Sequence, residues 1–112
     1  MIHKETAEHY SWGNGCDGWR LVQRTDVSVI QERMPPGSSE IRHLHRQAWQ
    51  FFFVLRGEAT LEVNEKVSVL KTNYGMEVPP GVPHQIFNKS EQDLDILVIS
   101  KPPSHGDRVL PP

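Results

Sequence analysis

The sequence predicts an all-β fold, either a two-sheet jelly roll or a small β-barrel. From residue 20 onward, short runs rich in valine, isoleucine, leucine and phenylalanine alternate with segments of glycine, proline, asparagine and aspartate. Branched and aromatic runs bounded by turn formers are typical of strands. No stretch shows a good helical period, and no internal repeat is present. A chain of about eight to ten short strands must close or stack its sheet to protect the strand edges.

The predicted strands follow one another at close, regular spacing. Pro35, Pro36 and Gly37 end the second strand, and Arg56 and Gly57 form a later turn. The dipeptide 64–65 fits a tight hairpin turn. We expect strands over residues 20–23, 27–33, 41–45, 51–55, 58–63, 66–70, 76–78, 84–88 and 94–100.

Both ends of the chain are predicted to be irregular extensions of one domain that spans residues 1–112. Residues 1–19 contain a loop dense in glycine, asparagine and aspartate, framed by Trp12 and Trp19. These tryptophans are expected to cap one end of the core, with the wall of a ligand pocket as the alternative. Residues 101–112 are rich in proline and are expected to pack as an irregular strap.

Composition excludes several classes of partner and location. With 12 Lys and Arg against 14 Asp and Glu, the formal net charge is -2, so no nucleic-acid or membrane partner is expected. The longest apolar runs are far too short to span a membrane. The N-terminus is polar and lacks the apolar segment of a secretory signal. Cys16 is the sole cysteine, which excludes an intrachain disulfide and fits a cytoplasmic location.

Three histidines and a glutamine form a candidate metal site. His43 and His45 are one residue apart in a predicted strand, so their side chains point to the same face and make half of a metal site. Gln50 precedes an aromatic strand, and prolines and a glycine deliver His84 to the start of another. We expect these four side chains to meet around one metal ion. The alternative is that the histidines are hydrogen-bonded polar residues of a barrel interior and Gln50 marks a lost site.

Two motifs in the chain resemble those of the cupins. The first is Gly37-x5-His43-x-His45-x4-Gln50-x6-Gly57, and the second is Pro79-x-Gly81-x2-His84-x3-Asn88. The resemblance covers residues 27–100, which would form the barrel core. Cupins usually have glutamate where this chain has Gln50 and glycine where it has Asn73. Asparagine tolerates a left-handed backbone, so the turn at Asn73 should survive.

The resemblance implies a fold, a metal site and an assembly. The fold would be the cupin double-stranded β-helix, a jelly-roll barrel with the metal in its mouth. The implied ligands are His43, His45, Gln50 and His84, and the implied assembly is a homodimer. The chain is similar to short RmlC-like cupins that are often labelled mannose-6-phosphate isomerase-like.

The predicted ligand set favours a particular chemistry. Three neutral imidazoles suit one divalent transition metal ion such as zinc, iron, nickel, copper or manganese. The neutral amide of Gln50 would leave the full charge of the metal to act as a Lewis acid. This favours an isomerase or lyase acting on a small polar molecule such as a sugar acid or keto acid. The alternatives are a non-catalytic module that binds or senses a small ligand, and an iron-dependent dioxygenase.

The C-terminal tail contains a second group of chemically active residues. His105, Asp107 and Arg108 place an acid/base pair and an anion binder within four positions. If the tail folds over the barrel mouth, His105 becomes the first candidate for a catalytic general acid or base. The alternative is a solvated terminus. Three further residues close to the histidine pair are expected near the mouth, where they could support the ligands: Glu40, Arg46 and Gln47.

Overall fold

The computed structural model describes residues 1–112 and contains strands without helices. This confirms the predicted all-β class. The structure has no helix long and apolar enough to span a membrane. The strands are β1 (Glu8–Trp12), β2 (Cys16–Gln23), β3 (Ser28–Met34), β4 (Leu44–His45), β5 (Trp49–Arg56), β6 (Ala59–Val63), β7 (Lys66–Leu70), β8 (Gly75–Val78), β9 (His84–Phe87), β10 (Leu94–Lys101) and β11 (Arg108–Val109).

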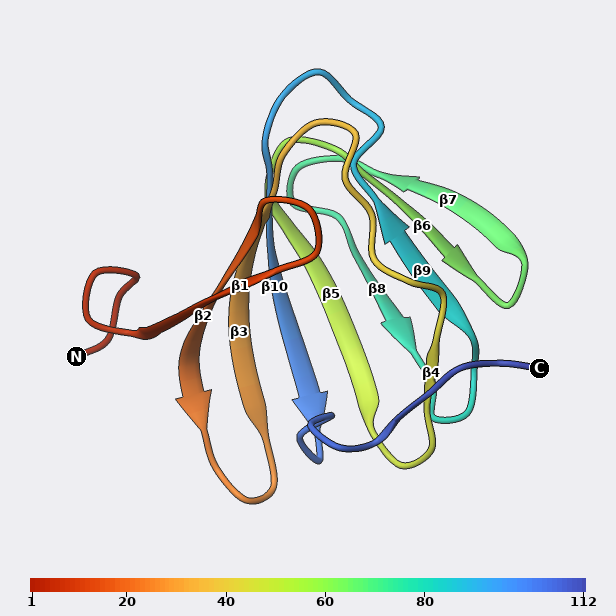
Figure 1. The fold of residues 1–112 in the computed structure, drawn as a ribbon, viewed down its shortest axis with the longest axis horizontal. Coiled ribbons are helices and arrows are strands. Elements are labelled where there is room, and N and C mark those ends of the chain that lie inside the picture. The colour runs from red at the N-terminus through yellow and green to blue at the C-terminus, as the bar shows by residue number, and fades with distance from the viewer.

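The strands form three sheets around one core. The largest has six strands in the order β1-β2-β3-β10-β5-β8, the second pairs β11 with β4, and the third has the order β7-β6-β9. Figure 1 shows the six-stranded sheet on the left and β6, β7 and β9 on the right. The C-terminal segment leaves β10 and crosses the lower end of the molecule toward β4 (Figure 1).

Strand β5 shows how the sequence pattern builds the interior. Gln50, Phe52 and Val54 are buried, whereas Phe51 and Phe53 between them are half-buried. This alternation is the period of two that a strand with one inward face requires. The inward positions join a core cluster contributed by both large sheets. Gln50 is therefore held inside the barrel by the same alternation that buries its apolar neighbours.

The first nineteen residues differ from the irregular extension that the sequence predicts. Strands β1 and β2 form an antiparallel hairpin and join the six-stranded sheet next to β3. Gly13 and Gly15 take positive φ angles in the turn, which is why a glycine-rich segment suits a hairpin here. Cys16 is 1% exposed and starts β2. Trp12 packs against the core, as a capping residue would.

Two predicted turns keep their expected conformation. Asn64 and Glu65 have φ angles of 51° and 72°, which is the left-handed pair that a tight two-residue hairpin needs between β6 and β7. Asn73 has a φ angle of 69°, so asparagine does adopt the left-handed conformation at the position where cupins usually have glycine. The tail is irregular as predicted, except for the short strand β11.

Candidate metal centre

The backbone fixes the separation of two predicted ligands. His43 and His84 form an isolated antiparallel bridge, in which the N–H of each donates to the carbonyl of the other at 3.0 and 2.8 Å. His45 follows in β4, and the alternation of an extended chain keeps its ring on the side of His43. The strand pairing, and not the reach of flexible side chains, therefore brings the imidazoles together.

The three imidazoles form a tight, buried cluster. One ring nitrogen from each of His43, His45 and His84 lies within 4.8 Å of the others. Their residues are 5%, 6% and 1% exposed. The three ring centroids are separated by 4.9, 4.5 and 5.7 Å. A cluster of three nitrogen donors at this spacing could hold a transition metal ion.

Two of the rings have a tautomer fixed by the backbone. His43 Nδ1 lies 2.7 Å from the carbonyl oxygen of Ile41, and His84 Nδ1 lies 3.0 Å from that of Val82. Because a carbonyl only accepts, each Nδ1 carries the hydrogen, and each Nε2 keeps its lone pair. His84 Nε2 is buried and has no hydrogen-bond partner. Such outer contacts are typical of histidines that bind metals.

Burial keeps the imidazoles in the form that binds metals. It lowers the pKa of His43 to about 4. It also lowers the pKa of His45 and of His84, and the imidazole of His84 adds to the effect on the pKa of His45. The three rings are therefore neutral at neutral pH, with lone pairs available. The buried His45 Nδ1 also lacks a hydrogen-bond partner. The alternative of a hydrogen-bonded barrel interior requires the protein to satisfy every ring nitrogen, and the protein does not do so here.

Gln50 presents an oxygen atom inside the same cavity. Its Nε2 donates to the hydroxyl of Ser100 at 2.9 Å, which fixes the orientation of the amide. Its Oε1 is buried and has no hydrogen-bond partner. An orphaned amide oxygen that lines the same cavity as His43 and His45 fits a divalent cation, because the cation would satisfy atoms that the protein leaves unpaired.

The C-terminal tail lies over the mouth of this site. A cavity of about 260 Å³ is lined by the candidate ligands His43, His45 and Gln50 together with His105 and Arg108 of the tail. Both tail residues are also exposed to solvent. The condition under which His105 becomes a candidate acid or base is therefore met.

Asp107 has a different role from the one that its spacing predicts. Its carboxylate accepts hydrogen bonds from the backbone N–H groups of Arg46, Gln47 and Ala48 at 3.1, 2.9 and 3.0 Å. These donors lower the pKa of Asp107. The carboxylate thus anchors the tail to the loop between β4 and β5 and is not free to share a proton with His105.

Two carboxyl groups and a phenol complete the cavity wall. Burial raises the pKa of Glu40 to about 8, with a further contribution from Glu32. It raises the pKa of Glu32 to about 7, and Tyr10 lies 3.4 Å from that carboxyl as a hydrogen-bond donor. Glu40 was expected near the mouth, whereas Glu32 and Tyr10 were missed. Alternation with Ile30 and Met34 along β3 is a signal that could have identified Glu32 as inward-facing.

The chain is similar in sequence to one protein family and to several individual proteins. The sequence profile of the Cupin domain family matches residues 30–100. An uncharacterized protein of Methanocaldococcus jannaschii is 30% identical over 81 residues, covering 71% of this chain and 65% of that protein. The H2HPP isomerase of Bacillus subtilis is 28% identical over 103 residues, covering 89% and 42%. An oxalate-binding protein of Thermotoga maritima is 30% identical over 67 residues, covering 60% and 55%.

The chain spans less than two thirds of the length of each of these relatives. Two solved structures share its fold. An RmlC-like cupin from Shewanella frigidimarina has a TM-score of 0.84 and 21% identity, with 92% of this chain and 90% of that chain covered. KdgF from Halomonas sp. has a TM-score of 0.85 and 14% identity, with 92% and 93% covered. The predicted jelly-roll fold of the cupin type is confirmed.

Proposed function

Because the chain belongs to the cupin family, we propose that it is a metal-dependent enzyme of the isomerase or lyase type that acts on a small polar acid. The substrate class is a sugar acid or a keto acid. The observation that carries the proposal is the buried cluster of three neutral imidazoles beside the unpaired Oε1 of Gln50, open to a cavity with an arginine at its mouth. The similarity to an isomerase adds support.

Four side chains would hold the metal. The histidines His43, His45 and His84 supply neutral nitrogens, and Gln50 supplies its amide oxygen. A divalent ion bound there supplies Lewis acidity, which polarises a carbonyl or lowers the pKa of a bound water. The hydrogen bond from the NH2 group of Gln50 to the hydroxyl of Ser100 fixes the orientation of the amide and leaves the amide oxygen available to the ion.

The tail supplies the groups that bind the substrate and move its proton. Arg108 lines the cavity and would bind the carboxylate of the acid, because its planar guanidinium pairs with both oxygens. A ring nitrogen of His105 would accept a proton from one atom of the substrate and return it to the adjacent atom of the substrate. Asp107 holds both residues at the mouth through its three backbone hydrogen bonds. The single-domain organisation, the homodimer and the cytoplasmic location stay predictions.

Metal content and turnover test the proposal together. Protein purified without chelators or a metal-affinity tag should contain close to one equivalent of a transition metal by mass spectrometry. It should convert candidate sugar acids or keto acids, and the double variant His43→Ala, His84→Ala should lose both metal and turnover. Turnover that persists in this variant would contradict a metal-dependent enzyme.

Other outcomes of the same experiment favour the alternatives. Metal-dependent binding of an acid without turnover favours a binding module, a role consistent with the similarity to an oxalate-binding protein. Bound iron together with oxygen consumption favours a dioxygenase. His3→Ala is the matched control, because His3 is exposed and does not line the cavity.

A further inference from the structure

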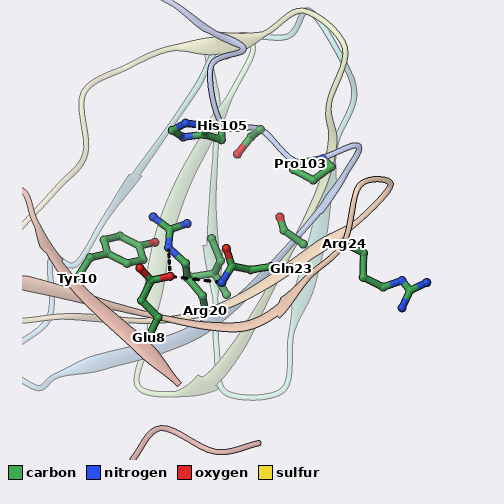
Figure 2. Close-up of a pocket in the computed structure, with 10 residues that line it drawn as sticks. Glu8, Tyr10, Arg20, Gln23, Arg24, Pro103 and His105 are labelled. Carbon is green, nitrogen blue, oxygen red and sulfur yellow. Dashed lines mark hydrogen bonds and ion pairs between the residues drawn. The ribbon is translucent and has the colours of Figure 1, made fainter. Parts of the chain in front are cut away.

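A second cavity adjoins the metal pocket. Its volume is about 550 Å³, which is in the range of sites for small molecules. It lies between the hairpin of β1 and β2, the strand β3 and the start of the tail (Figure 2). Tyr10, Ile30, Ser104 and His105 line both cavities, so the two cavities meet at these side chains.

Arg20 is the cationic group that faces into this outer cavity. Its Nε lies 3.4 Å from Oε1 of Glu8, and Gln23 donates to the same oxygen at 3.3 Å. The guanidinium lies over the ring of Tyr10, 4.4 Å from the ring centre. The guanidinium of Arg20 is therefore oriented by Glu8 at its Nε edge and by the ring of Tyr10 against one of its faces. Figure 2 shows its two terminal nitrogens directed away from Glu8, toward the side of the cavity where His105 lies.

The hairpin backbone is shaped to hold this arrangement. Gly18 lies opposite Tyr10 in the register of β1 and β2. A Cβ atom at Gly18 would lie 2.2 Å from Cζ of Tyr10, so only glycine lets the phenol ring rest against β2 at this place. The ring in turn supports Arg20 on one side and reaches Glu32 in the metal pocket.

We propose that the outer cavity binds a second anionic group of the substrate, a carboxylate or a phosphate, at Arg20. The inference rests on the proposed function, in which the metal pocket holds the other end of the acid. The two terminal nitrogens of the guanidinium form one N–H edge that Glu8 does not occupy, and such an edge suits bidentate binding of an anion. The substrate is accordingly a dianionic acid that extends from the metal pocket past Tyr10 and His105 to Arg20.

Two keto acids of different length test this extension. Calorimetry on the metal-loaded protein compares pyruvate, which has one carboxylate, with 2-oxoadipate, which adds a distal one. We expect 2-oxoadipate to bind at least about tenfold more tightly, since a charge-assisted hydrogen bond contributes roughly that much. Arg20→Gln should remove the difference and leave pyruvate binding and metal content unchanged.

Arg24→Gln is the matched control. Arg24 also lines the cavity, but its side chain is 72% exposed and extends away from the other lining residues in Figure 2. This variant should keep the preference for 2-oxoadipate. An equal preference in the wild type and in Arg20→Gln would overturn the assignment of Arg20, while pyruvate binding would still support the proposed function.

A second measurement keeps the inference testable if neither keto acid binds, which would count against the proposed function. Glutarate and inorganic phosphate are titrated separately into metal-free protein while NMR follows the Nε–H signals of the arginines. A saturable shift at Arg20, absent at Arg56, which ends β5 and does not line the cavity, supports the anion site. The stronger probe distinguishes carboxylate from phosphate. No shift at Arg20 with either probe overturns the inference.

Discussion

Glu40 is a residue whose ionisation couples the site to folding. Its Oε1 is enclosed and unpaired, and burial raises its pKa from 4.5 to about 8. The folded protein therefore holds a proton that the unfolded chain releases as the pH rises above 4.5. The stability that this proton contributes is complete below pH 4.5 and is lost as the pH rises through 8.

The variant Glu40→Gln tests this coupling in metal-free protein, because glutamine stays neutral at every pH. Relative to the wild type, its free energy of unfolding should rise by about 4 kcal/mol between pH 4.5 and pH 8.5, an order-of-magnitude figure from the pKa shift. Urea titrations at several pH values measure the difference. Glu91→Gln, at an exposed position, should show no such trend. A difference that does not vary with pH would mean that Glu40 ionises normally in the fold.

The tail is the element that supplies one wall of the cavity at the mouth of the barrel. It is tied down by the three hydrogen bonds to Asp107 and by the pairing of β11 with β4. Both attachments lie on the segment that carries His45, so the tail and a predicted metal ligand share one support. The position of His105 and Arg108 over the cavity therefore depends on a carboxylate that touches neither substrate nor metal.

Asp107→Ala should release the tail while leaving the barrel folded. We expect amide hydrogen exchange over residues 104–109 to accelerate by about tenfold or more, since each hydrogen bond to a charged group contributes on the order of 1.5–3 kcal/mol when well formed. The affinity for acidic ligands should fall, because Arg108 is no longer held at the mouth, and metal content should stay the same. Asp26→Ala is the control, since Asp26 makes only a loose surface pair with Arg24 at 3.9 Å. Unchanged exchange in the tail would show that Asp107 does not anchor it.

At the scale of the whole molecule, the candidate ligands come from separate sheets. His45 belongs to the sheet of β4 and β11, Gln50 to the six-stranded sheet, and His84 to the sheet of β9. A bound ion would therefore cross-link all three sheets, and only the folded chain brings its ligands together. Ligand binding to the folded state alone raises stability by mass action. The apolar core does not include these residues, so the metal-free chain should still fold.

Metal removal should accordingly lower the melting temperature without unfolding the protein. At a free metal concentration about a hundred times Kd, the expected difference is on the order of 10 °C. Differential scanning calorimetry with and without a chelator measures it. The variant His84→Ala should have the same melting temperature with and without the chelator. If the melting temperature of the wild type is also unchanged by the chelator, the ion does not link the sheets.

The sequence predicted the central part of the fold and the site better than its ends. Alternation and turn formers identify β5 and the turns at Asn64 and Asn73, because these features are encoded locally. The hairpin of β1 and β2 was missed, since Gly18 is read as a breaker although it serves to accommodate Tyr10 across the strand. Asp107 was assigned the wrong partner because its three donors lie some sixty residues away in the chain. Local patterns cannot supply such distant pairings.

The reciprocal backbone pairing of His43 with His84 makes the geometry of the site independent of the side chains that occupy it. Exchange of one imidazole for a carboxylate or a thiolate would alter charge and metal preference while the underlying strands stay in register. The backbone of the barrel thus fixes the positions of the candidate ligands, and each ligand side chain can be substituted separately. One or two substitutions at these positions would therefore be enough to change which ion the proposed site prefers.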